Sequence, residues 1–195
     1  MKHYSKVIGA ALTCTCLVFL SGCNGLNKES ELHADALLAA KIEQAESESM
    51  YQRGLDYLEG RNGSERSSAK AVHWLEQAAD RGHIQAQMAL AEFYRLTDGK
   101  QYVYWMQRAA ERGSTEAQLL LAHAYGRGEV LKTPKYATAF YWYNKAALNG
   151  NKNALYWLGW SYLKGEGIPV DIELAKYWFR RSSDPRAAKE LAKLK

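Results

Sequence analysis

The side chains best suited to covalent chemistry in this chain are its three cysteines, Cys14, Cys16 and Cys23. The first two lie in an almost wholly apolar run, residues 7–20, which follows a lysine-bearing start and precedes small residues. This pattern is typical of a secretory signal, which is removed and takes no part in the fold. We therefore expect residues 1–22 to be a signal peptide and Cys23 to be the only cysteine of the mature chain. A single cysteine can form neither a disulfide within the chain nor a cysteine-based metal site.

Histidines and carboxylates, the usual side chains of acid–base and metal chemistry, show no catalytic spacing. The histidines beyond the signal are His33, His73, His83 and His123. No two of them lie four residues apart, as the metal-binding pattern H-E-x-x-H requires. The sequence also has no nucleophile elbow and no paired carboxylates at a recognisable spacing. It therefore predicts no enzyme, and we expect no cofactor, no metal and no small-molecule substrate.

The residues in front of Cys23 point to a modification of its thiol. Leu20, Ser21, Gly22 and Cys23 together resemble a lipobox, the processing site of bacterial lipoproteins. The resemblance implies that Cys23 is acylated and becomes the first residue of the mature chain, anchored in a membrane by its lipid. The alternative is an ordinary signal peptide that is cut near Gly22 and leaves a free thiol. An exposed free thiol is a liability in an oxidising compartment, which favours the lipid.

Asn24 follows the predicted lipid anchor. In lipoproteins of enteric-type bacteria, an aspartate at that position favours retention in the inner membrane. By resemblance, asparagine implies transfer to the outer membrane, with the protein facing the periplasm. We expect residues 23–29 to be a lipidated tether.

Charge gives no sign of a nucleic-acid partner. The whole chain has 26 basic and 21 acidic side chains, but residues 1–22 hold two lysines and no acid. Removal of the signal leaves 24 basic against 21 acidic side chains, a net charge of +3. There is no run of lysines or arginines that would favour a phosphate backbone. The sequence therefore predicts no nucleic-acid binding.

An aromatic period organises the rest of the chain. A tyrosine ends one expected helix and a tryptophan lies in the next, four times over: Tyr57 and Trp74, Tyr94 and Trp105, Tyr125 and Trp142, Tyr162 and Trp178. The tryptophans are 31, 37 and 36 residues apart. A period of this length is typical of stacked helix pairs.

Small residues recur at fixed distances from these aromatics. They lie three and eight residues before each tyrosine, at Gly54, Ala91, Ala122 and Gly159 and at Ser49, Ala86, Ala117 and Ala154. A small pair follows each tryptophan, at Ala78-Ala79, Ala109-Ala110, Ala146-Ala147 and Ser182-Ser183. Positions 0, 4 and 8 residues before each tyrosine share a helix face, and we expect the small residues to let neighbouring helices approach closely. Glycines end the second helices, at Gly82, Gly113 and Gly150.

This pattern resembles the Sel1-like repeat, a relative of the tetratricopeptide repeat. The clearest copy runs from Ala154 to Trp178 and includes Gly165-Glu166-Gly167. The resemblance covers 47–184, as repeats 47–83, 84–114, 115–151 and 152–184. It implies an all-α fold, an α-solenoid (α/α right-handed superhelix) of about four helix-pair repeats. We expect N- and C-terminal capping helices at 30–46 and 185–195.

The function that the resemblance implies is protein binding by the concave face of the solenoid, as an envelope scaffold or adaptor with a protein partner. One alternative is a periplasmic immunity lipoprotein that neutralises a secreted toxic effector, such as a phospholipase, by binding it. Another is a cell-wall or polysaccharide enzyme, which the absence of catalytic spacing disfavours.

The second repeat departs from the pattern, because its tyrosine and tryptophan are 11 residues apart, against 16 or 17 elsewhere. We expect shorter helices or a compressed joint in that repeat.

Candidate partner contacts lie two and five residues before the framework tyrosines, on a face distinct from the packing face. They are Gln52 and Leu55, Glu92, Leu120 and His123, and Trp157 and Trp160. Tryptophan is a favoured anchor of protein interfaces. The alternative for Trp157 and Trp160 is that they only cover the C-terminal capping helix, through Ala187 or Leu191.

Overall fold

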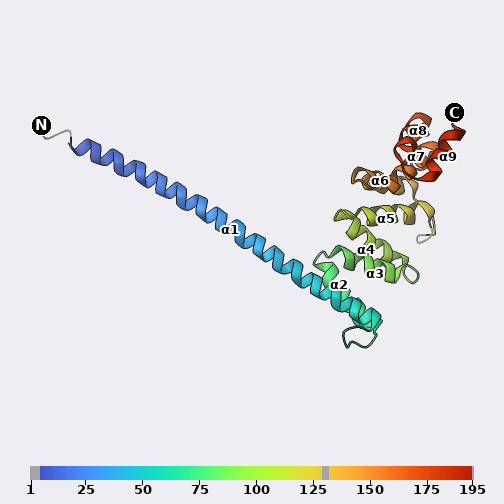
Figure 1. Ribbon diagram of the computed structural model, residues 1–195, viewed down its shortest axis with the longest axis horizontal. Helices are drawn as coiled ribbons and strands as arrows, with labels where there is room; N and C mark the ends of the chain where they lie inside the picture. Colours follow the sequence, from blue (N-terminus) through green and yellow to red (C-terminus); the bar gives the residue numbers. More distant parts are fainter. Residues whose placement is uncertain (1–4, 129–131, 195) are drawn as a thin grey trace. The chain divides into compact units, whose positions relative to one another are not determined.

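The computed structural model describes residues 5–128 and 132–194, with side chains from residue 30 onward. Across these residues the secondary structure is helical throughout, in the order α1 (Ser5–Glu59), α2 (Ser68–Asp80), α3 (Ile84–Tyr94), α4 (Gly99–Glu111), α5 (Thr115–Arg127), α6 (Tyr136–Leu148), α7 (Lys152–Lys164), α8 (Ile172–Arg181) and α9 (Pro185–Lys193). The chain divides into two units, Met1–Ala45 and Glu46–Lys195. The second unit holds the repeats, and in it each helix from α2 to α9 packs against the next (Figure 1).

The first unit contains the predicted tether and N-terminal capping helix. Residues 30–45 lie in α1, which also supplies the first helix of the repeat unit, so no helix boundary falls at the expected end of the cap. Leu32, Leu38 and Ile42 are more than half exposed. The packing of residues 30–46 on the first repeat stays a prediction. The expected signal peptide, lipobox and Cys23 lie outside the residues whose side chains the structure describes.

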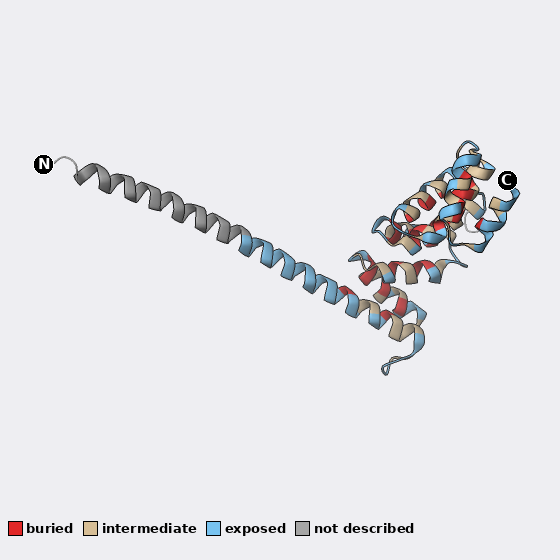
Figure 2. Ribbon diagram, turned by 45° about the horizontal axis from the view of Figure 1, so that its top comes forward, coloured by how far each residue is buried: buried red, intermediate tan, exposed pale blue. Residues whose placement is uncertain are grey.

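The small residues of the first helices lie where neighbouring helices approach, except Ser49, which is exposed. Leu90, Leu121 and Leu158 are fully buried beside the alanine columns, and buried residues line the facing sides of the repeat helices (Figure 2). A Cβ atom added to Gly159 would stand 2.6 Å from the Phe179 ring, and one added to Gly54 would stand 2.7 Å from Leu75. Because each glycine has only a hydrogen atom in place of a side chain, the two helices of its repeat can pack this closely.

The glycine stops are confirmed, since Gly82, Gly113 and Gly150 all have φ near +90°. Only glycine adopts this conformation without steric cost, and it ends each second helix before the next repeat begins.

Two buried glutamines close the joints between repeats. Gln87 Nε2 donates to the Ala79 carbonyl at 2.8 Å, and Gln118 Nε2 donates to the Ala110 carbonyl at 2.9 Å. Each carbonyl lies in the last turn of the preceding second helix, where it also accepts from the amide of the glycine that ends that helix, and the glutamine adds a second bond to it. Leu155 holds the same register position in the fourth repeat and cannot form this bond.

The second repeat is compressed in both of the expected ways. Helix α3 has 11 residues where α5 and α7 have 13, and only four residues separate α3 from α4. Asp98 accepts hydrogen bonds from the amides of Lys100 and Gln101 and so caps α4 directly.

The prediction that Ser182 and Ser183 continue the packing face of the second helix in the fourth repeat is wrong. Helix α8 ends at Arg181, and Ser182 is its extended C-cap. The Ser182 hydroxyl accepts a hydrogen bond from the Asp184 amide, so it directs the chain into α9 instead. Asp184 caps α9 and Pro185 occupies its first turn, where the C-terminal capping helix is expected.

Candidate protein-binding site

Three of the predicted contact residues meet in the C-terminal half of the repeat unit. His123 from α5 lies edge-on to the Trp157 ring of α7, with 4.9 Å between ring centroids. Trp157 also stacks on Tyr143 of α6 at 5.8 Å. Trp157 and Trp160 line one pocket of about 150 Å³, together with Arg127, Tyr136, Tyr143 and Glu166 among others. We call this pocket the aromatic pocket.

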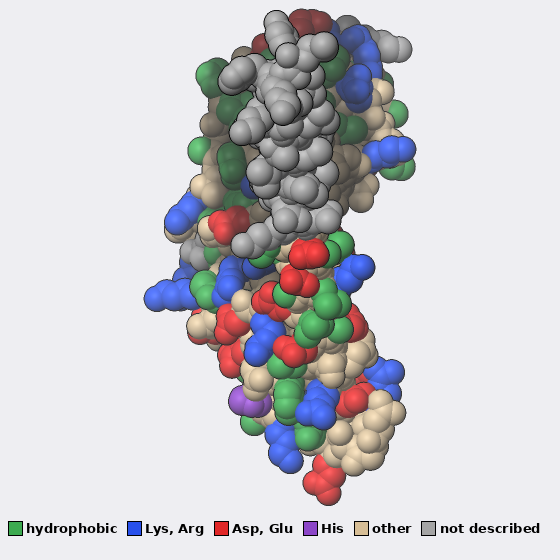
Figure 3. All heavy atoms as spheres, turned by 90° about the vertical axis from the view of Figure 1, so that its left-hand side faces the viewer, with side chains coloured by type: hydrophobic (Ala, Val, Ile, Leu, Met, Phe, Trp, Pro, Cys, Tyr) green, Lys and Arg blue, Asp and Glu red, His purple; other side chains and the backbone are tan. Residues whose placement is uncertain are grey.

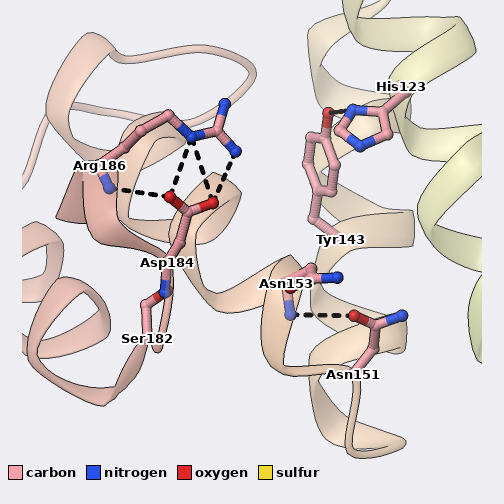
Figure 4. Close-up of polar contacts among 7 residues, drawn as sticks. All are labelled: His123, Tyr143, Asn151, Asn153, Ser182, Asp184 and Arg186. Carbon is pink, nitrogen blue, oxygen red and sulfur yellow. Dashed lines mark hydrogen bonds and ion pairs between the residues drawn. The ribbon is translucent and has the colours of Figure 1, made fainter.

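A partly buried hydrogen bond joins Tyr143, which lines the pocket, to His123 behind it. Tyr143 Oη and His123 Nδ1 are 3.0 Å apart (Figure 4). Burial lowers the pKa of His123 to about 4, and the charges of Arg127 and Arg186 add to the shift. Burial also raises the pKa of Tyr143. Both side chains are therefore neutral near pH 7 and present hydrogen-bonding groups without charge.

The C-terminal capping helix supplies a cation to the same cluster. Asp184 holds the Arg186 guanidinium through contacts of 2.6 Å and 3.0 Å (Figure 4). This bonding lowers the pKa of Asp184. Arg186 in turn lies 4.3 Å above the Tyr156 ring and 5.0 Å above the Trp157 ring. The residue that caps α9 thus also orients a cation onto the aromatic cluster.

The two tryptophans also pack against the end of the solenoid, as the alternative interpretation expects. They border a buried cluster that includes Tyr156, Phe179 and Ala187, with Leu191 beside it. Both remain only partly buried. The structure therefore gives Trp157 and Trp160 a packing contact on one side and a pocket on the other.

The remaining candidates lie apart from this cluster. Gln52 hydrogen-bonds Glu48 one turn earlier on α1, and Glu92 pairs with Arg95 at the end of α3. Leu120 on α5 is 37% exposed and Leu55 on α1 is partly buried.

Sequence reasoning missed Arg127, Arg186 and Glu166 as neighbours of the tryptophans. Arg127 follows the framework Tyr125 by two residues, and that offset was the only signal for it. Arg186 reaches the cluster from α9, which no repeat pattern covers.

Two other features are not found among the described residues. Among those whose side chains are described, no group of histidine, cysteine and acidic side chains is suited to hold a metal ion. Within the same residues, no helix combines the length and apolarity needed to cross a membrane. Acidic and basic side chains are interspersed on the face that Figure 3 shows.

Comparisons with known proteins agree with this fold. The Sel1 repeat model matches residues 47–83, 84–114, 115–151 and 152–184. A Sel1 repeat protein from Oxalobacter formigenes is 32% identical with a TM-score of 0.63, over 80% of this chain and 46% of that one. A protective antigen present in uropathogenic Escherichia coli strains, which displays an SLR fold, is 25% identical with a TM-score of 0.60, over 78% of this chain and 34% of that one. This chain therefore spans less than half the length of either structure. No curated protein matches it. The four matched repeats fill most of the chain, which belongs to the Sel1 repeat family.

Proposed function

We propose that this chain is a bacterial envelope lipoprotein, anchored in the outer membrane through Cys23, whose repeat unit binds another protein at the aromatic pocket. Sel1 repeats are typically scaffolds for protein–protein interaction, and the family supports a protein partner. The observation that carries the proposal is the pocket between Trp157 and Trp160, where partly buried aromatic rings and Arg127 meet. Such rings anchor interfaces because they bury a large area with few rotatable bonds.

Trp160 is the better of the two tryptophans for testing this site. Trp157 contacts His123, Tyr143 and Arg186, so its removal also disturbs packing. The aromatic neighbour of Trp160 is Tyr156, and their ring centroids are 6.2 Å apart. We expect Trp160→Ala to lower partner capture at least tenfold, as loss of an interface hot spot does. The measurement is a crosslinked pull-down from the native envelope, with the melting temperature recorded in parallel.

Tyr104→Ala is the matched control, because Tyr104 is a 49% exposed aromatic residue on α4, outside the aromatic pocket. It should leave capture unchanged. Equal capture by the wild type and Trp160→Ala, with a clear loss of melting temperature, would show that the tryptophan only packs. If the captured protein is a toxic phospholipase that the chain inhibits, the binding role is immunity. Turnover of a polysaccharide that is lost on neutralising one carboxylate would contradict the proposal.

The anchor has a separate test. Cys23→Ser removes the thiol that the lipid requires, so the chain should accumulate as an unprocessed or soluble species. Membrane fractionation and mass measurement of the N-terminal fragment distinguish these forms from the lipidated one. Unchanged fractionation of the variant would refute lipidation and leave the binding proposal standing.

A further inference from the structure

A second and larger pocket lies where α6, α7 and α8 meet, at the joint between the third and fourth repeats. Its volume is about 610 Å³ and its lining includes Leu148, Lys152, Leu155, Tyr177, Trp178 and Arg181. We call it the α6–α8 pocket. It shares no lining residue with the aromatic pocket. Two cations and no carboxylate line it, and Leu148 at its edge is 76% exposed.

The first joint has an ion pair that this one lacks. The second helices of repeats two, three and four carry a cation three residues after their tryptophans, at Arg108, Lys145 and Arg181, whereas Gln77 holds that position in the first repeat. The residue six positions after the tryptophan of the preceding repeat is Asp80 for Arg108, Glu111 for Lys145 and Leu148 for Arg181. At the first joint Arg108 Nη1 and Asp80 Oδ1 form an ion pair at 2.9 Å. At the third joint a leucine takes the place of the acid. Arg181 keeps the contact with the tyrosine ring before its tryptophan, 5.3 Å above Tyr177, that Arg108 and Lys145 also make in their own helices.

Two more changes make the third joint apolar and basic. Leu155 replaces the glutamines that bond across the first two joints. Lys152 stands where Ile84 and Thr115 stand in the preceding repeats. Neither Lys152 nor Arg181 has an ion-pair partner among the residues that the structure describes. Lys152 also begins α7, whose N-terminus carries partial positive charge.

These features select a ligand with a negative head and an apolar body. Unpaired cations beside a helix N-terminus favour a phosphate group. The exposed Leu148 and the half-exposed Tyr177 offer an apolar surface next to it. The pocket volume lies in the range of small-molecule sites. We propose that the α6–α8 pocket binds the phosphate head of an anionic amphiphile, an anionic phospholipid, with hydrocarbon resting on Leu148 and Tyr177.

The test uses the mature chain carrying Cys23→Ser, so that no lipid of its own holds the protein to a bilayer. The chain is sedimented with vesicles of phosphatidylglycerol and phosphatidylcholine, or of phosphatidylcholine alone. We expect binding to the first vesicles only, weakened by salt. Leu148→Glu restores the acid that the other joints carry, so it should preserve the fold while lowering vesicle affinity about fivefold or more. Lys152→Thr, which copies Thr115, should lower it by a similar factor.

Arg108→Gln is the control, because Arg108 is already paired with Asp80 and should contribute little. A melting curve with inorganic phosphate separates the two sources of the anion. Stabilisation by phosphate without vesicle binding would mean that the ligand is a free anion, and would overturn the lipid assignment. Equal vesicle binding by the wild type and Leu148→Glu would overturn the pocket itself. The aromatic pocket is tested with other variants, so either proposal can fail alone.

Discussion

His123 connects three elements through one imidazole ring. It lies on α5, bonds Tyr143 on α6 and contacts Trp157 on α7. Burial lowers its pKa from 6.5 to about 4, because a charged ring would lose its hydration between these helices. The neutral ring is therefore part of the packing, and protonation works against the folded state.

The pH dependence of stability should show this. As pH falls from about 6.5 towards 4, an unfolded chain protonates His123 while the folded chain does not. The unfolded state then binds more protons, so the free energy of unfolding decreases over this window. His123→Asn has no titrating ring and can still bond Tyr143, so its stability should fall less. Urea denaturation of both proteins across the window measures the difference, and parallel curves would contradict this account.

Position in the repeat predicted part of the candidate site. Offsets to the framework tyrosines place His123, Trp157 and Trp160 on one face, and in the structure Trp157 contacts His123 and lines the aromatic pocket with Trp160. Gln52 and Glu92 share the same offsets but bond within their own helix or its end. The offset of a residue from the framework tyrosine predicts which face of the helix it lies on, but not which side chains of other helices it reaches. Arg186, which lies outside the repeats, had no offset to be read from.

At the scale of the elements, the distance between the two helices of a repeat depends on the smallest residue in their contact. Gly159 on α7 faces the Phe179 ring on α8, and Gly54 faces Leu75. The sequence predicted this because the small columns recur with the tyrosines. It did not predict that α8 stops before its serine pair, since a serine is compatible with both a helix and a cap.

Two glycine substitutions separate close packing from helix propensity. In Gly159→Ala the new Cβ would stand 2.6 Å from the Phe179 ring, which should destabilise the repeat unit by about 1–3 kcal/mol. In Gly126→Ala the nearest atom, Ala139 Cβ, is 3.4 Å away. That variant should be neutral or gain up to about 1 kcal/mol, because alanine favours a helix more than glycine does. Chemical denaturation gives both values, and equal effects would mean that the α7–α8 contact tolerates a methyl group.

At the scale of the whole molecule, the repeat unit is a chain of contacts between neighbours. From α2 to α9 each helix packs on the next, and helices two apart also touch, α5 and α7 through His123 and Trp157, and α7 and α9 at the C-terminal end. The predicted solenoid of about four repeats is confirmed, because the period of the aromatic and small residues encodes which helices stack. A helix is also expected at 30–46, and these residues lie in α1. What that helix packs on does not follow from its own period, because many surfaces satisfy one apolar stripe.

A solenoid in which each repeat contacts mainly the adjacent repeats should lose stability locally when its end is removed. Truncation after Asp184 deletes α9 and uncovers the cluster of Tyr156, Phe179 and Ala175, which α9 covers through Ala187. It also removes Arg186 from the Trp157 ring. We expect amide hydrogen exchange to accelerate in α7 and α8 and to stay unchanged in α2 and α3. Arg186→Ala, which keeps α9 but removes the cation, should produce a smaller effect confined to the same helices. Uniform acceleration along the repeat unit would instead show that the four repeats unfold as one cooperative body, with the capping helix stabilising all of them.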